Sequence, residues 1–144
     1  MLEYKRNSKK ETKNWSPLYT LKVSEGVHAI SNGNDRVTLF LKNGFDLKLE
    51  FKGKEMMEGI VFSGNGAETN NFMENKRTFY MSDYANPKSY FKLEKADYEA
   101  KLAEAKTVLK KYKDDATNLD SIINSMDERN DQMFFGYIEA NYEK

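Results

Sequence analysis

The sequence of 144 residues contains no cysteine, a single histidine and two prolines. Without cysteine the chain has no thiol nucleophile, disulfide, thiolate zinc site or iron–sulfur cluster of its own. With His28 as the one histidine, it also lacks the residues of a multi-histidine metal centre. The sequence therefore predicts no catalytic residue, no bound metal and no cofactor, and the chain is expected not to be an enzyme.

A net charge is also lacking, because 23 Lys and Arg residues balance 23 Asp and Glu residues. Affinity for nucleic acids comes largely from basic surface, so this balance argues against a nucleic-acid partner. Basic residues gather only near the N-terminus, where we expect an exposed hairpin loop that carries Lys5, Arg6, Lys9, Lys10 and Lys13.

Long apolar runs are absent as well. No window reaches the roughly 20 apolar residues of a membrane-spanning helix. The first residues also lack the apolar stretch of a signal peptide, so no signal is expected within this chain. A chain of this length hides roughly 70% of its unfolded surface when it folds, which is enough for one domain with its own core.

In the first half of the chain, apolar residues alternate with polar ones, which is the period of a half-buried strand. Strands are expected over residues 18–23, 27–30, 37–41, 45–51 and 60–62. The Asn43-Gly44 dipeptide between two alternating runs favours a hairpin, because both central residues of a type I′ turn need a positive φ. We therefore expect residues 37–41 to pair antiparallel with residues 45–51.

After Gly66 the apolar period changes from two to about 3.6. Three helical patterns follow, and Asp97 and Lys101, four residues apart, are expected to form an exposed ion pair. The predicted fold is α+β: an antiparallel, sandwich-like meander in residues 1–66, followed by about three α-helices in residues 67–144. Residues 1–144 are expected to form a single accessory domain.

The segment Gly64-Asn65-Gly66 lies between the last strand and the first helix. It is similar to a phosphate-binding loop, but Thr69 stands where a dinucleotide-binding fingerprint needs a third glycine. The favoured interpretation is structural. The glycines allow a sharp turn, Asn65 caps the helix, and Glu68 completes a capping box three residues later.

Carboxylates cluster at Asp127, Glu128 and Asp131. They are interpreted as a solvated helix face, and the alternative is weak binding of a hard cation. A carboxylate pair for glycoside hydrolysis also stays open, although nothing marks two acids as partners.

Two further sets of residues are candidates for binding. Tyr4, Trp15 and Tyr19 are candidates for an aromatic platform for a sugar or a peptide, with sheet packing as the alternative. The end of the chain is unusually apolar and suggests a surface that a partner covers, formed by Phe134, Phe135, Tyr137, Ile138 and Tyr142. His28 is interpreted as an ordinary strand residue.

Two segments, residues 39–47 and 62–73, resemble the N-terminal accessory domain of secreted thioredoxin-like thiol:disulfide oxidoreductases of the TlpA/ResA type. Residues 62–73 read FSGNGAETNNFM and match the family's Phe-x-Gly-x-Gly-Ala-x-x-Asn-Asn-aromatic turn. In residues 39–47 the match departs from the family, because Asn43 stands where proline is common and Phe45 intervenes before Asp46.

The resemblance implies an exported, often lipid-anchored protein in the periplasm or cell envelope of a Gram-negative anaerobe. A thioredoxin-like domain with the catalytic Cys-x-x-Cys would follow this chain as its covalently linked partner, and protein substrates of that domain would be further partners. The implied function is a non-catalytic accessory domain that positions the redox domain or recognises its partner. The alternative function is a stand-alone extracytoplasmic domain that binds a glycan or a peptide.

Overall fold

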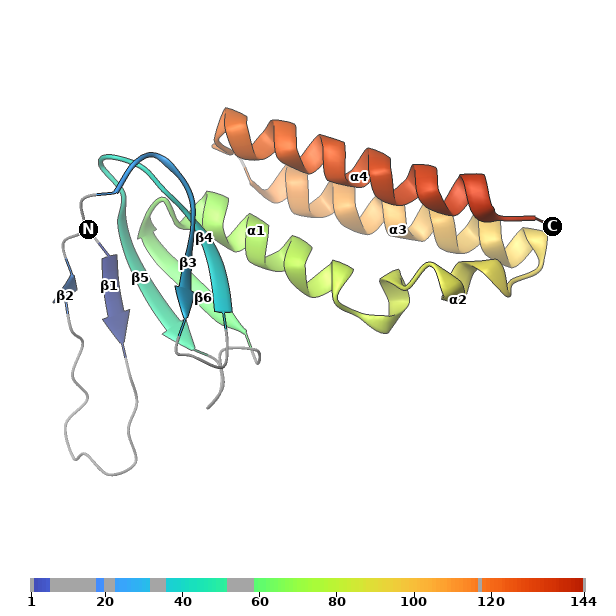
Figure 1. The fold of residues 1–144 in the computed structure, drawn as a ribbon, viewed down its shortest axis with the longest axis horizontal. Coiled ribbons are helices and arrows are strands. Elements are labelled where there is room, and N and C mark those ends of the chain that lie inside the picture. Colours follow the sequence, from blue (N-terminus) through green and yellow to red (C-terminus); the bar gives the residue numbers. More distant parts are fainter. Residues whose placement is uncertain are drawn as a thin grey trace, which may run out of the picture. The chain divides into compact units, whose positions relative to one another are not determined.

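The computed structural model describes residues 2–5, 18–19, 23–31, 36–51, 59–116 and 118–143. Within these ranges strands precede helices, so the predicted α+β class is confirmed (Figure 1). The chain divides into two compact units, residues 1–74 and 75–144. The division falls inside the first helix, later than the boundary that the sequence predicts at residue 66.

The strands of the first unit are β1 (Leu2–Lys5), β2 (Leu18–Tyr19), β3 (Gly26–Ser31), β4 (Arg36–Leu41), β5 (Asp46–Phe51) and β6 (Ile60–Asn65). The helices are α1 (Ala67–Tyr80), the 3-10 turn η2 (Asp83–Ala85), α2 (Lys88–Phe91), α3 (Lys95–Asp115) and α4 (Ser121–Asn141). The strands predicted over residues 27–30, 37–41 and 45–51 are confirmed to within a residue at each end. β6 continues beyond the predicted residues 60–62.

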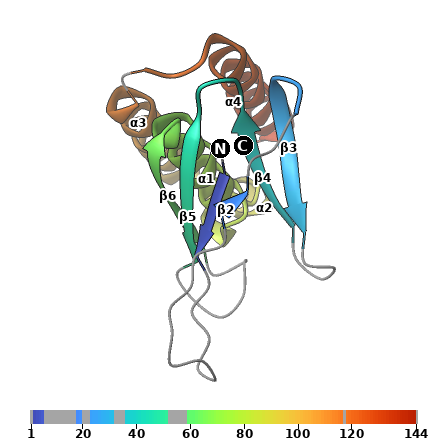
Figure 2. The same ribbon diagram turned by 90° about the vertical axis from the view of Figure 1, so that its left-hand side faces the viewer.

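The strands form two sheets, with the order β2-β1-β5-β6 in one and β3-β4 in the other. Figure 2 shows β5 and β6 on one side and β3 and β4 on the other. β1 pairs antiparallel with β2, so the base of the predicted N-terminal hairpin is confirmed. Lys5 is the last residue of β1, and the other basic residues of the predicted loop, Arg6, Lys9, Lys10 and Lys13, lie outside the described residues. β1 also pairs in parallel with β5, which a simple antiparallel meander does not contain.

The core of this unit lies between the two sheets. Alternate residues of three strands are almost completely buried in one cluster, formed by Val37, Leu39 and Leu41 of β4, Leu47 and Leu49 of β5, and Ile60 and Phe62 of β6. A shift of register by one residue would turn such a set towards solvent, so the alternation fixes the register. The predicted sandwich-like arrangement is therefore confirmed.

The hairpin predicted at Asn43-Gly44 is wrong. β4 pairs with β3 instead, and β5 pairs with β1 and β6. The backbone N–H of Phe45 does donate to the carbonyl of Lys42 at 3.1 Å, but only Gly44 has a positive φ, of +89°. A type I′ turn needs a positive φ at both central residues, so this turn leads the chain from one sheet into the other.

The second unit is helical and has an aromatic core. Phe79 packs with Ala105 and Leu109, and a neighbouring cluster contains Tyr90 and Ile138. No helix within the described ranges has both the length and the apolar character needed to cross a lipid bilayer.

Candidate functional site

The segment from Gly64 to Gly66 makes a strand-to-helix connection in which two glycines are required by space. A Cβ added to Gly64 would lie 2.2 Å from the carbonyl oxygen of Asp46. A Cβ added to Gly66 would lie 2.5 Å from the ring of Phe45. Both glycines also have a positive φ, so a side chain would be strained even without these contacts. The predicted sharp turn at these glycines is present.

Asn65 does not cap the helix as the sequence suggests. It is the last residue of β6, opposite Asp46, and its Nδ2 donates to the carbonyl oxygen of Gly44 at 2.6 Å. Gly66 stands before the first helical residue instead, which places Glu68 only two residues along from it. The capping box predicted for Asn65 and Glu68 is therefore wrong, because Gly66 and not Asn65 is at the N-cap position.

The next two residues of functional interest, Asn70 and Asn71, bind the edges of the two sheets. Oδ1 of Asn70 accepts from the backbone N–H of Phe40 at 2.7 Å, and its Nδ2 donates to the Phe40 carbonyl at 3.0 Å. Asn71 makes the same pair of bonds to Phe62 of β6, each at 2.9 Å. Consecutive side chains of α1 thus satisfy backbone groups of both sheets.

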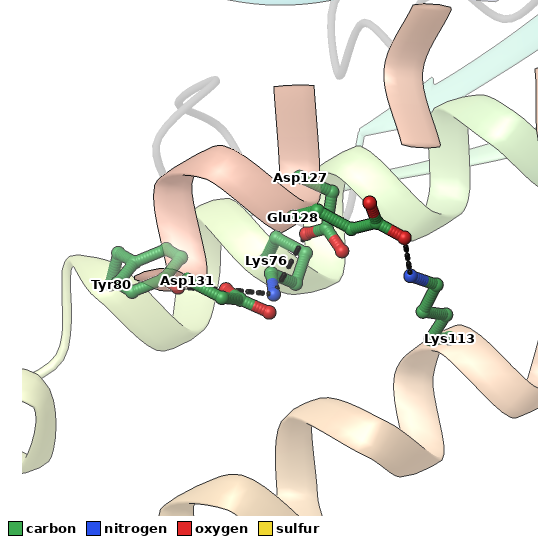
Figure 3. Close-up of polar contacts among 6 residues, drawn as sticks. All are labelled: Lys76, Tyr80, Lys113, Asp127, Glu128 and Asp131. Atoms are coloured by element: carbon green, nitrogen blue, oxygen red, sulfur yellow. Dashed lines mark hydrogen bonds and ion pairs between the residues drawn. The ribbon is translucent and has the colours of Figure 1, made fainter. Parts of the chain in front are cut away.

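A polar cluster lies inside the helical unit, between α1 and α4 (Figure 3). Nζ of Lys76 is 2.8 Å from Asp127 Oδ1 and 2.6 Å from Asp131 Oδ1. The Tyr80 hydroxyl donates to the same oxygen of Asp131. Lys76 and Asp127 are deeply buried, with side chains 9% and 6% exposed, whereas Asp131 is 25% exposed.

Burial sets the electrostatics of this cluster. It raises the pKa of Asp127 above the ordinary carboxyl value, and the Lys76 ammonium opposes that rise. Burial, together with the bond to Asp131, also raises the pKa of the Tyr80 hydroxyl. Tyr80 is therefore a proton donor at neutral pH. One ammonium faces two carboxylates, which gives the cluster a formal charge of −1.

This arrangement stabilises the helical unit and leaves no vacant ligand set. The carboxylates of Asp127 and Asp131 already bind Lys76 and Tyr80, and Glu128 binds Lys113 at 3.1 Å. The interpretation of these acids as a solvated face is wrong for Asp127, which is buried. Within the described part of the chain, no group of three His, Asp or Glu residues is placed to hold a metal ion.

Lys101 is a second half-buried cation, on α3. Its Nζ donates to Ser89 Oγ at 2.6 Å, and that hydroxyl donates in turn to the carbonyl of Asn86 at 2.7 Å. Because the Ser89 proton is used in this way, Ser89 accepts from the ammonium and is not activated as a nucleophile. This contact replaces the exposed ion pair with Asp97 that the sequence predicts.

The rings of Tyr84 and Tyr90 cover the same ammonium, at 4.7 and 4.3 Å from Nζ to their centroids. Burial lowers the pKa of Lys101, and the charge of Glu104 opposes that shift. Burial also raises the pKa of Tyr90 to about 12. The contacts join α2 to α3.

The partner surface predicted near the C-terminus is largely internal. Ile138 is fully buried, which removes it from that surface, and Phe134 and Phe135 pack against the aromatic core. Tyr142 stacks on Tyr98 with ring centroids 3.6 Å apart. Of the five predicted residues, Tyr137 alone is classed as exposed, at 55%.

Tyr137 belongs to a different apolar stripe on α4, which the sequence pattern did not separate from the buried one. Its other members are also well exposed: Ile122 at 48%, Met126 at 40% and Met133 at 67%. With 3.6 residues per turn, spacings of four, seven and four place all four residues on one side of the helix. We call these four residues the α4 face. The buried Ile123 and Ile138 directly follow Ile122 and Tyr137 and lie about 100° further round the helix.

The remaining predicted residues are placed as follows. Backbone pairing includes Tyr4 of β1 and Tyr19 of β2, while Trp15 lies outside the described residues, so the aromatic platform stays a prediction. His28 is a residue of β3, and its Nε2 donates to the carbonyl of Ser24 at 2.7 Å, as expected of an ordinary strand residue.

Comparisons with protein-family models, curated proteins and solved structures give no match to this chain. The relation to TlpA/ResA-type accessory domains, which residues 39–47 and 62–73 suggest, therefore stays a prediction.

Proposed function

We propose that this chain is a non-catalytic accessory domain of an exported thioredoxin-like thiol:disulfide oxidoreductase, which positions the redox domain or recognises its partner. The observation that carries the proposal is the part played by residues 62–73, the segment of closest resemblance. Gly64 and Gly66 are required by the contacts of the turn, and Asn70 and Asn71 bind the two sheets. The residues that match the family's motif therefore stabilise the fold, as expected of an accessory domain with no active site of its own.

The α4 face supports an interaction role independently of that resemblance. Exposed apolar side chains that gather on one helix face are typical of protein interaction sites. A domain that holds a partner beside a linked redox site raises the partner's local concentration to the millimolar range for a short linker. Recognition by this domain would then increase the rate of a reaction that its neighbour catalyses.

The native polypeptide tests this proposal. An antibody against the 144-residue chain would be used to isolate the protein from its own cells, and its mass and thiol content would be measured before and after reduction. We expect a longer polypeptide with a Cys-x-x-Cys pair that a maleimide labels only after reduction. A native polypeptide that ends near Lys144, or one without thiols, would refute the proposal.

A stand-alone peptide-binding domain is the second candidate, and the α4 face favours it as well. The same isolation separates the two candidates, because the second one expects no linked redox domain.

A further inference from the structure

We infer that the α4 face binds an amphipathic helix of a separate protein, one that carries an acidic residue in the middle of its apolar seam. The inference deepens the proposed function and rests on its interaction role, since it names the partner that the domain would recognise.

The shape of the α4 face fits a helix. From Ile122 to Tyr137 the face spans 16 residues, and the 15 steps of 1.5 Å between them give a length of about 22 Å. Its spacings are those of a helical seam, in which side chains of one helix insert between those of another. Gly136 adds room, since a Cβ placed on it would meet no atom within 4 Å.

The positive charge of the α4 face predicts a negatively charged group on the partner. Arg129 lies within the stripe, between Met126 and Met133, and is exposed without an ion-pair partner among the described residues. The two exposed acids of α4 lie on the side of the helix that faces α3, where Glu128 pairs with Lys113 and Glu139 with Lys106. A carboxylate from a partner would therefore complete the face, and would fix the register of the bound helix.

A second copy of the chain does not fit. The stripe is centred between residues 129 and 130, so two copies that overlap their stripes fully would bring their Arg129 side chains together. This holds for parallel and antiparallel pairs alike, and like charges placed face to face oppose association.

The composition favours a separate, exchangeable partner over a permanently docked domain. Half of the apolar residues of the face are methionines, Met126 and Met133, whose flexible side chains adapt to different partners. Permanent interfaces are larger and more uniformly apolar than a single stripe centred on an arginine.

Two synthetic 18-residue helices test the recognition. Both would have leucines along one seam, and they would differ only in a central Glu or Lys. Fluorescence anisotropy with the 144-residue chain should show the Glu peptide binding at least tenfold more tightly. Arg129→Glu should reverse this preference, and Met133→Gln should weaken binding of the Glu peptide at least tenfold. Met81→Gln is the matched control, because Met81 is 59% exposed outside α4, and it should leave binding unchanged.

Absence of binding by both peptides would overturn the inference, and so would equal binding that Arg129→Glu does not alter. Self-association of the chain that Met133→Gln abolishes would show that a second copy covers the face, with the same consequence. These results do not depend on whether a redox domain follows the chain, so the inference and the proposed function can fail separately.

The source of the partner is tested in the full-length protein in its own cells. Met133→p-benzoylphenylalanine would cross-link whatever covers the face, and mass spectrometry would identify the attached peptide. We expect a helical segment of another polypeptide with an acidic residue in its apolar seam. Attachment to the same polypeptide or to a second copy, to a segment without such a residue, or no attachment at all would overturn the inference.

Discussion

Replacing Lys76 with methionine tests how the helical unit tolerates buried carboxylates. The substitution keeps most of the side-chain volume but removes the ammonium that contacts both Asp127 and Asp131. Breaking a buried ion pair in this way costs about 3–5 kcal/mol, because a charge is left buried without compensation. Asp131 is 25% exposed and can regain water, so the lower value of about 3 kcal/mol is expected.

The expected loss is measurable by chemical denaturation followed by circular dichroism at 222 nm, which reports the helices. A loss of about 3 kcal/mol corresponds to a fall of roughly 6–12 °C in Tm for a chain of this size. Lys113→Met is the matched control, because it removes an exposed ion pair to Glu128 from the same unit. It should cost less than about 1 kcal/mol.

The cost of Lys76→Met should also depend on pH. Burial raises the pKa of Asp127 above 3.8, so between that value and the folded-state pKa the folded chain binds the proton more tightly than the unfolded chain. The contribution of Asp127 to stability is therefore present at low pH and is lost as pH rises through the raised pKa. Removing Lys76 removes the group that opposes the rise, so the pKa of Asp127 should rise further in the variant.

Lys76→Met should consequently be most destabilising near pH 7 and less so towards pH 4. The double variant Lys76→Met with Asp127→Leu should recover part of the loss at neutral pH, because no unpaired charge then remains at that position. The reasoning is refuted if Lys76→Met and Lys113→Met cost the same, or if the loss from Lys76→Met is unchanged between pH 7 and pH 4.

Four further variants probe the turn, the sheet edges and α4, each by thermal denaturation. Asn70→Ala should cost about 2–4 kcal/mol, because it leaves the buried N–H and C=O of Phe40 without partners, and a loss below 0.5 kcal/mol in that assay would contradict a stabilising role of these two bonds. Gly66→Ala should destabilise by more than about 1 kcal/mol, whereas Gly136→Ala, in an open helical position, should stabilise by about 0.5–1 kcal/mol; equal effects would contradict the steric argument. Tyr142→Phe removes a 2.8 Å hydrogen bond to a backbone carbonyl and should cost about 1 kcal/mol, while retention of full stability would show that ring stacking alone holds this end.

The strands could be predicted from the sequence, but their partners could not. Alternation placed the core positions of β4 and β5, since burial on one face requires a period of two. The Asn43-Gly44 dipeptide predicted that these two strands pair with each other, which is wrong. A local turn signal indicates where the chain bends, but not which sheet the next strand joins. The opposition of β4 to β5 across the core depends on contacts that no local pattern records.

The spacing of residues in the sequence contains a signal of the polar cluster. Lys76 and Tyr80 are four residues apart on one helix, as are Asp127 and Asp131 on another, so each pair shares a helix face. A cation and a hydroxyl on one face match two carboxylates on the other. The register that brings the two pairs together is set by helix packing, which the sequence alone does not reveal.

The two apolar faces of α4 show a related limit. In the sequence, Ile122, Ile123, Met126 and Met133 belong to one apolar pattern. In the structure Ile122 is exposed, whereas Ile123 is buried. An apolar helix end predicts either a core or a partner surface, and α4 has a buried and an exposed apolar stripe next to each other. Only the burial of each side chain in the structure distinguishes the two stripes.

The side-chain bonds of Asn70 and Asn71 have a consequence for association between molecules. Unpaired N–H and C=O groups on an edge strand are a template on which another chain can add a strand, which is a common start of aggregation. At Phe40 and Phe62 these groups are occupied by amide side chains of the same chain. Two adjacent asparagines therefore protect one edge of each sheet, at positions where neither a proline nor a charged side chain performs that task.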